Sequence, residues 1–418
     1  MNFKLHFFLL VFMLFLNPLF ANESNAISYT RDIKPILDNR CVTCHSCYNS
    51  PCQLKLSSFE GIKRGATKKA IYENRLNAAD PTRLFVDALN EEEWRKKEFY
   101  SISDHFENTN DSIMTKLLEH KQKNPLNIGT YSPETDELTC IKNEKELNKY
   151  LKENPNKGMP YGFPPLSKEE NKLLNLWLKH NRLISDEKFI FNDKEAKLIK
   201  ETEEFFNNQD IKHQVTARYI YEHLFLAHIS FDKNSKNFFE LVRSRTKTGP
   251  IDIIATRFPY EGVEEEFYYR LRVIKSTIVH KTHMVYEINE KKLERYKELF
   301  INPKWIEPPH MPTYDYNIST NSLRTFKQIP ANSRYQFLLD DIDYIIMTYI
   351  RGPVCKGQIA LNVINDHFWV MFMDPKYDLS VKNRYYLDAN LHNLSIPNIY
   401  RENPDLLKTF TVVEYYEQ

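Results

Sequence analysis

The segment Cys41-Val42-Thr43-Cys44-His45 carries the clearest chemistry in the sequence. Two cysteines with two residues between them, followed at once by histidine, form the attachment pattern of c-type haem. The two thiols add to the haem vinyl groups, and the adjacent imidazole reaches the iron as an axial ligand. We therefore predict that Cys41 and Cys44 bind haem c covalently and that His45 ligates its iron.

A second iron ligand is predicted far along the chain, at Met159. Met159 lies in a loop rich in Gly and Pro, and a Ser-capped helix signal with an apolar face follows it. Cytochromes c present a methionine thioether to the iron from such a loop. His105, His120 and an open or water-bound iron remain alternatives for this position.

The surroundings of the cysteine motif support haem over a zinc-knuckle-like site or a plain disulfide. Residues 29–37 form a short amphipathic helix signal that leads into the motif, as at the start of many cytochrome c domains. Residues 1–21 have a basic start, an apolar run and a small residue before a polar stretch, which is typical of a secretory signal peptide. The alternative for this segment is an uncleaved membrane anchor.

Composition narrows the function classes. The chain has 418 residues and a formal net charge of +1, without a polybasic tail, so nothing indicates nucleic-acid binding.

Of the remaining cysteines, Cys47 and Cys52 are the default disulfide in an oxidising compartment, and Cys52–Cys140 is an equally allowed pairing. Cys355 is expected to be a buried residue or a disulfide partner.

The pattern predicts a mainly α cytochrome c-like haem domain over residues 26–185, with an insertion, followed by a mixed α+β domain over residues 213–418. Residues 186–212 are predicted to form a polar linker with a Lys/Glu-rich helix. Further helices are expected at 80–120, 143–153, 215–229, 288–301 and 331–350, strands at 238–243 and 267–274, and a final element at 357–374.

The second domain also offers polar side chains for a ligand. Two arginine pairs, Arg243 with Arg245 and Arg270 with Arg272, lie on predicted strands and are candidates for a carboxylate or phosphate head group. The competing interpretation is that they are solvated charges on an exposed strand face. Four histidines are weaker candidates for metal or proton binding: His223, His228, His280 and His283.

Several long segments resemble the periplasmic fatty acid cis/trans isomerases of Gram-negative bacteria. The resemblance rests on residues 41–54, 158–162, 218–228, 241–246, 250–257, 278–284 and 352–364. It implies a periplasmic haem enzyme that converts cis double bonds of unsaturated fatty acids to trans without ATP or nicotinamide. Trans chains pack straighter, so the membrane becomes less fluid under stress.

The resemblance also implies the partners. These are unsaturated fatty acids or phospholipid acyl chains, a membrane contacted peripherally, and the cytochrome c maturation machinery. His45 would be the catalytic iron ligand. Family members are longer, so this chain is expected to be an N-terminal portion, completed by another polypeptide or belonging to a truncated, inactive member. A periplasmic electron-transfer cytochrome is the other alternative.

Overall fold

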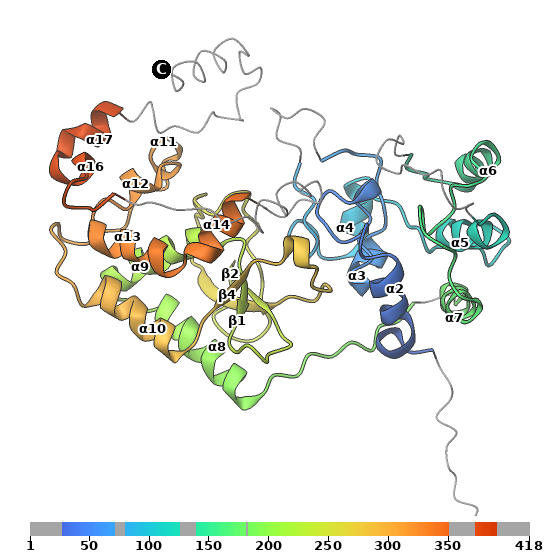
Figure 1. Cartoon of the computed structure of the whole chain (residues 1–418), viewed down its shortest axis with the longest axis horizontal. Coiled ribbons are helices and arrows are strands. Elements are labelled where there is room, and N and C mark those ends of the chain that lie inside the picture. The colour runs from blue at the N-terminus through green and yellow to red at the C-terminus, as the bar shows by residue number, and fades with distance from the viewer. Residues whose placement is uncertain (1–26, 72–79, 126–138, 181–182, 351–372, 391–418) are drawn as a thin grey trace, which may run out of the picture.

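The computed structural model describes residues 27–71, 80–125, 139–180, 183–350 and 373–390. Figure 1 shows helices α2–α7 on one side of the molecule and the sheet with α8–α14 on the other. Residues 183–192, which have no regular structure, connect the two parts. The predicted signal peptide, Cys355 and most of the element expected at 357–374 lie outside the described residues.

Residues 41–45, the predicted haem-attachment motif and called the haem motif below, are positioned by a short helical segment. A π-helical turn, η1 (Tyr29–Ile33), continues into α2 (Lys34–Arg40), which ends at Cys41. The Ser28 side chain caps the start by accepting a hydrogen bond from the Arg31 amide. One stripe of the segment is buried, formed by Tyr29, Ile33, Ile36 and Leu37. The amphipathic helix predicted at 29–37 is thus confirmed.

The rest of the first part is helical, with long loops. Its elements are η2 (Pro51–Gln53), α3 (Phe59–Arg64), α4 (Glu91–Lys96), α5 (Ile113–Lys123), α6 (Glu144–Glu153) and α7 (Lys168–Leu178). The helix predicted at 143–153 and the loop around Met159 are confirmed. The continuous helical region predicted at 80–120 is wrong, because Asn90 and Ser112 each start a new helix as N-caps and the residues between α4 and α5 form loops and turns.

These helices share one apolar cluster. It contains the buried stripe of η1 and α2 together with residues from α5 and α7, such as Leu118, Leu174 and Trp177. The start of α7 has a capping box, in which Ser167 and Glu170 bond reciprocally to each other's backbone amides. The Ser-capped helix after Met159 is therefore confirmed, and its apolar face covers the core beside the haem motif.

The second part begins with two helices and a small sheet. Its elements are α8 (Asp193–Phe206), α9 (Ile211–Leu224), β1 (His228–Ser230), β2 (Phe239–Ser244), β3 (Tyr268–Val273), η3 (His280–Thr282) and β4 (Val285–Glu287). Helices follow: α10 (Glu290–Tyr296), η4 (Lys297–Ile301), α11 (Tyr316–Ser319), α12 (Ser322–Thr325), α13 (Ala331–Asp340), α14 (Ile342–Ile350), α16 (Leu379–Lys382) and α17 (Arg384–Asn390).

The sheet has the strand order β3-β2-β1-β4. β2 pairs antiparallel with β3 and β1, whereas β1 and β4 are parallel. In β3 the side chains of Tyr269 and Leu271 are buried in the aromatic-rich second core, while Arg270 and Arg272 point to the opposite face. The strands predicted at 238–243 and 267–274 are confirmed, and the molecule is mainly helical with one small mixed sheet.

Three element predictions in this part are corrected. The helix expected at 215–229 ends at Leu224, because His228–Ser230 pairs as a strand with β4. The helix expected at 331–350 is two helices, since Asp341 is non-helical and its buried carboxylate accepts hydrogen bonds from Tyr286 and Lys292. The Lys/Glu-rich helix expected within 186–212 is confirmed as α8, but it buries Leu198, Phe205 and Phe206 in the core and is therefore not part of a polar linker.

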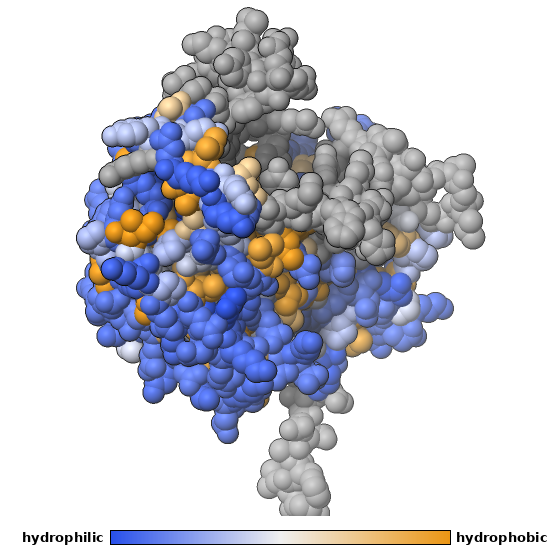
Figure 2. Space-filling model, turned by 60° about the vertical axis from the view of Figure 1, so that its left-hand side comes forward, coloured by the Kyte–Doolittle hydropathy of each residue, from blue (hydrophilic) through white to orange (hydrophobic). Residues whose placement is uncertain are grey.

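The face of the molecule seen in Figure 2 is mostly polar where it is coloured. In Figure 2 blue residues cover most of the visible face and orange ones form separate patches. Within the described ranges, no helix is both long and apolar enough to cross a membrane.

Candidate functional site

The haem motif forms a compact turn at the end of α2. The backbone amides of Cys44 and His45 both donate to the carbonyl of Cys41, over 3.1 and 2.9 Å. Cys41 is half-buried and Cys44 is exposed, and both carry free thiols. Burial raises the pKa of Cys41 to about 12, so its thiol stays protonated at neutral pH. The turn therefore presents two thiols that no disulfide uses.

His45 has the arrangement expected of an iron ligand. Its ring is buried, and Nδ1 donates to the carbonyl of Leu54 over 3.1 Å. Its own carbonyl accepts from the amide of Leu56, which fixes the residue from a second direction. Burial lowers the pKa of His45, so the imidazole is neutral. A neutral ring with its proton on Nδ1 keeps the Nε2 lone pair free for a metal.

The disulfides support a separate role for the motif cysteines. Cys52 is bonded to Cys140, and Cys47 is also disulfide-bonded. The pairing Cys47–Cys52 therefore does not form, and the alternative with Cys140 does. In the described part of the chain only Cys41 and Cys44 keep free thiols. The donor set thus fits thioether attachment of haem c.

Met159 lies on a separate loop that is fixed to α5. Its amide donates to the carbonyl of Leu117 over 3.1 Å. An added Cβ at Gly158 would lie only 2.7 Å from the backbone nitrogen of Lys121, so the loop sits directly against the helix. Leu117 and Cys41 both pack against the first apolar cluster. The Met159 loop and the haem motif therefore border one core.

The alternative distal ligands are already engaged. Nε2 of His105 bonds to the carbonyl of Leu178 at 3.0 Å, and Nε2 of His120 bonds to the carbonyl of Pro155 at 2.7 Å. Neither Nε2 atom is left for iron in this arrangement, so Met159 and an open or water-bound iron both stay as predictions.

The haem motif continues into the wall of a cavity between the two parts. Ser46, Cys47 and Tyr48, which follow His45 directly, line a space of about 600 Å³. The opposite wall comes from the second part and is largely apolar, with side chains that include Phe225, Leu226, Ile254, Ile278 and Met284. Ligand sites usually have volumes of about 300–1,000 Å³ and mostly apolar walls. This cavity has the size and lining of a small-molecule site.

A second cavity of about 890 Å³ adjoins the first. Both are lined by Leu84, Phe85 and Ile253. The larger one extends past Trp94 and Phe191 toward α8, away from the haem motif. Together they form a continuous groove along the boundary of the two parts.

Direct contacts hold the two parts in register around the groove. The amide of Thr277 donates to the carbonyl of Ser57 over 2.7 Å, and its hydroxyl donates to Asp38 of α2 over 2.6 Å. Lys275 forms a 2.9 Å ion pair with Glu60. The helix that leads into the haem motif is thus tied to the loop after β3.

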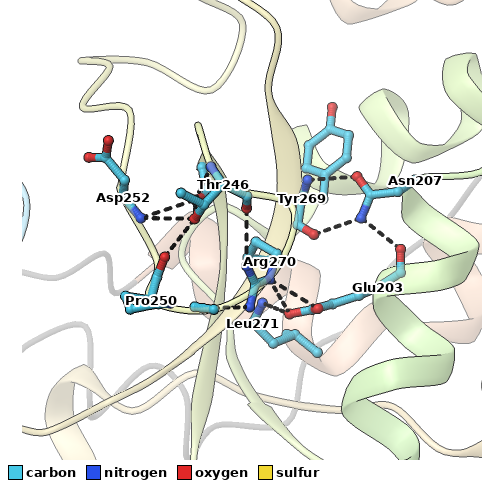
Figure 3. A network of polar contacts seen from close by, with 10 residues as sticks. Glu203, Asn207, Thr246, Pro250, Asp252, Tyr269, Arg270 and Leu271 are labelled. Atoms are coloured by element: carbon cyan, nitrogen blue, oxygen red, sulfur yellow. Dashed lines mark hydrogen bonds and ion pairs between the residues drawn. The ribbon is translucent and has the colours of Figure 1, made fainter.

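Arg270 and Arg272 already have partners in the structure. Figure 3 shows Arg270 directed toward Glu203 and Thr246. Its Nε lies 3.0 Å from a carboxylate oxygen of Glu203, and its other nitrogens donate to the carbonyls of Thr246 and Gly249. Arg272 pairs across the strands with Glu240 at 2.7 Å. Both line the groove, but their partners leave little donor capacity for a head group.

The other arginine pair is structural as well. Arg243 is buried and donates to Thr256 and to the carbonyl of Glu261, so its placement on an exposed strand face is wrong. Arg245 is exposed and forms ion pairs with Asp252 and Glu265. The contacts of all four arginines are therefore with other parts of the fold, and each arginine has a structural role.

Within the described ranges, the histidines of the second part are not arranged as a metal centre. Nδ1 of His228 lies 2.7 Å from Nδ1 of His283, so one ring donates and the other accepts. Burial lowers the pKa of His228 to about 4. His223 is bonded through Nδ1 to the carbonyl of Tyr219. In the described ranges, no three His, Cys, Asp or Glu side chains are grouped to hold a metal ion.

Comparison with known proteins assigns a family. The family model for fatty acid cis/trans isomerase (CTI) matches residues 79–418. The chain belongs to the fatty acid cis/trans isomerase family. Searches of curated proteins and of solved structures found no match. Membership of this isomerase family points to an unsaturated fatty acid or lipid as the substrate class.

The isomerase match covers only part of the site. It includes Met159, the sheet and most walls of the groove, but it starts after the haem motif. Four residues of the smaller cavity that precede the match were missed by sequence analysis as cavity residues: Ser46, Cys47, Tyr48 and Lys55. Proximity to the motif is the signal that marks the first three. No sequence pattern marks Lys55, because its place in the groove depends on how the two parts pack.

Proposed function

We propose that this family member is a periplasmic haem enzyme that converts cis double bonds of unsaturated fatty acyl chains to trans. The observation that carries the proposal is the continuity between the haem motif and the groove. His45 ends a turn with two free thiols, and the next residues line a mostly apolar cavity of about 600 Å³. A fatty acyl chain fits such walls, because burial of its methylenes removes apolar surface from water.

Four residues have a defined role in this proposal: three belong to the haem motif and the fourth is Met159. Cys41 and Cys44 would tether haem c, His45 would bind its iron through Nε2, and Met159 would supply the second protein ligand. The bound haem would supply a transient electron acceptor for the alkene, which would weaken the π bond that blocks rotation, and the electron would return to the substrate after rotation, so that there is no net redox change. The apolar walls hold the acyl chain and exclude water. The Leu54 carbonyl keeps the His45 ring in the ligating tautomer.

The physiological setting follows from the same hypothesis. Export through the predicted signal peptide delivers the chain to the periplasm, where the cytochrome c maturation machinery attaches haem. The substrate is an unsaturated fatty acid or phospholipid acyl chain drawn from a peripherally contacted membrane. Straighter trans chains pack more tightly, so the product lowers membrane fluidity under stress. The first part of the chain is in this view a cytochrome c-like domain with an insertion.

The test is replacement of the haem-binding residues. We expect His45→Ala and the double variant Cys41→Ala/Cys44→Ala to abolish trans fatty acid formation in cells and to remove the haem absorption spectrum. His105→Ala is the matched control, since its ring also bonds to a backbone carbonyl. Undiminished isomerisation in the His45 variant would contradict the proposal. Normal haem spectra without any isomerisation by the unmodified chain would favour an electron-transfer cytochrome instead.

A further inference from the structure

The groove beside the haem motif is strongly basic as well as apolar. Among the described residues, its smaller cavity has a single acidic lining residue, Glu240. The basic lining residues come from both parts of the molecule: Lys55, Arg83, Arg243, Arg257, Arg272 and Lys275. An excess of positive charge on an apolar site favours a ligand that is apolar along most of its length and anionic at one end.

Most of these cations are already in use. Arg83 pairs with Asp87 at 2.7 Å, Lys275 with Glu60, and Arg272 with Glu240. Arg243 donates to Thr256 and the Glu261 carbonyl, and Arg257 also interacts with a neighbouring group. Lys55 differs, because within the described residues its ammonium has no hydrogen bond and no ion pair.

The backbone of Lys55 is held in place. An added Cβ at Gly61 would overlap the carbonyl oxygen of Lys55, so helix α3 packs directly against this residue. The amide of the next residue, Leu56, donates to the carbonyl of His45 over 2.8 Å. Lys55 is therefore fixed at a short distance along the chain from the haem ligand, and its half-buried side chain lines the cavity.

We propose that Lys55 binds the anionic head group of the lipid that occupies this cavity. The head group is a carboxylate or a phosphate, and its acyl chain lies along the apolar wall formed by residues such as Phe225, Ile254 and Met284. This inference deepens the proposed function by naming the residue that would position the chain beside the haem motif. Lys55 is a substrate-binding residue in this assignment, with no part in bond rotation.

The charge state of Lys55 gives the site a pH dependence. Burial, and then the nearby Arg64, lower the pKa of Lys55 to about 7, while Glu240 acts in the opposite direction. A bound anion raises this pKa, so affinity is highest with protonated Lys55 and falls as pH rises above about 7. Three other titratable residues line the same cavity, besides the paired cations named above: Tyr48, Tyr221 and His228.

The experiment measures lipid binding to the purified full chain. The probes are palmitate, which has no double bond to isomerise, 1-hexadecanol, which has no charge, and phosphatidylglycerol vesicles. For wild type we expect tighter binding of palmitate or of the vesicles than of hexadecanol. A preference for palmitate identifies a free carboxylate as the ligand, and a preference for the vesicles identifies a phosphate head group.

Two substitutions at Lys55 test the charge. Loss of a charge-assisted hydrogen bond corresponds to about a ten- to hundredfold loss of affinity, which we expect for Lys55→Met. Lys55→Arg should bind within about threefold of wild type but lose the pH dependence above about pH 7, because guanidinium stays charged. Lys63→Met is the matched control, since Lys63 is half-buried and paired with Glu91 at the other cavity.

Wild-type affinity in Lys55→Met, or equal binding of hexadecanol and the anionic probes, would overturn the assignment. Because palmitate binding needs no catalysis, a failure here is distinct from a failure of the isomerase proposal. Lipid binding that depends on Lys55, in a protein without isomerase activity, would leave this inference intact and refute the catalytic proposal alone.

Discussion

Gly158→Ala should displace the Met159 loop and destabilise the first part of the molecule. The new Cβ would lie 2.7 Å from the Lys121 nitrogen and 2.9 Å from the Leu117 oxygen, both in the backbone of α5. These backbone atoms belong to a regular helix, so the loop has to move. Movement breaks the 3.1 Å bond from the Met159 amide to the Leu117 carbonyl.

The expected loss in the free energy of unfolding of Gly158→Ala has two sources. Overpacking of one methyl group in a closely packed site costs about 1–3 kcal/mol. The lost backbone hydrogen bond adds about 1 kcal/mol. We expect the free energy of unfolding, measured by urea titration, to fall by about 2–4 kcal/mol in total. If Met159 ligates haem iron, the reduced-minus-oxidised spectrum should change in the same direction as in Met159→Ala.

The control is Asn156→Ala, at an exposed position of the same loop. Surface changes of this kind usually stay within about 0.5 kcal/mol of wild type. If Gly158→Ala were as stable as the Asn156 variant, the close contact between loop and helix would be wrong. Lost stability with an unchanged spectrum would instead refute Met159 as the axial ligand.

Three further predictions concern the fold. Arg218→Met should lower the free energy of unfolding by about 3–5 kcal/mol, because it leaves the buried Glu222 carboxylate without its 2.8 Å partner. Cys140→Ser should cost about 4 kcal/mol in urea titration, since the bond to Cys52 closes a loop with a sequence separation of 88. The melting temperature should fall between about pH 6.5 and pH 4, because the pKa of His228 is lowered to about 4 and the unfolded state binds the proton first.

Each of these three predictions has a matched comparison. Arg245→Met removes an exposed arginine and should lower the free energy of unfolding much less than Arg218→Met does. Wild type under reducing conditions should lose at least as much stability as Cys140→Ser. His228→Gln should flatten the acid-side slope of melting temperature against pH, and an unchanged slope would show that another group causes it.

Local patterns in the sequence predicted much of the first part. The helix before Cys41, the capped helix after Met159 and the spacing of the haem motif depend on neighbouring residues, so the sequence displays them. The two long strands were equally clear, because alternation with period two is a local signal.

The errors arose where distant contacts decide the structure. Residues 225–229 continue the apolar pattern of α9, yet β4 pairs with His228–Ser230 and ends the helix early. Asp341 interrupts a long helical pattern because Tyr286 and Lys292 bind its carboxylate. The groove could not be predicted for the same reason, as its walls come from segments more than 200 positions apart.

The bond between Cys52 and Cys140 has a consequence for how the protein can be divided. A polypeptide that began at residue 79, where the family match begins, would keep Cys140 but lose the sulfur it is joined to. It would also lack Tyr48 and Lys55, so one side of the smaller cavity would open to water. The matched region is therefore a recognisable stretch of sequence, whereas the complete cavity also needs the residues before it.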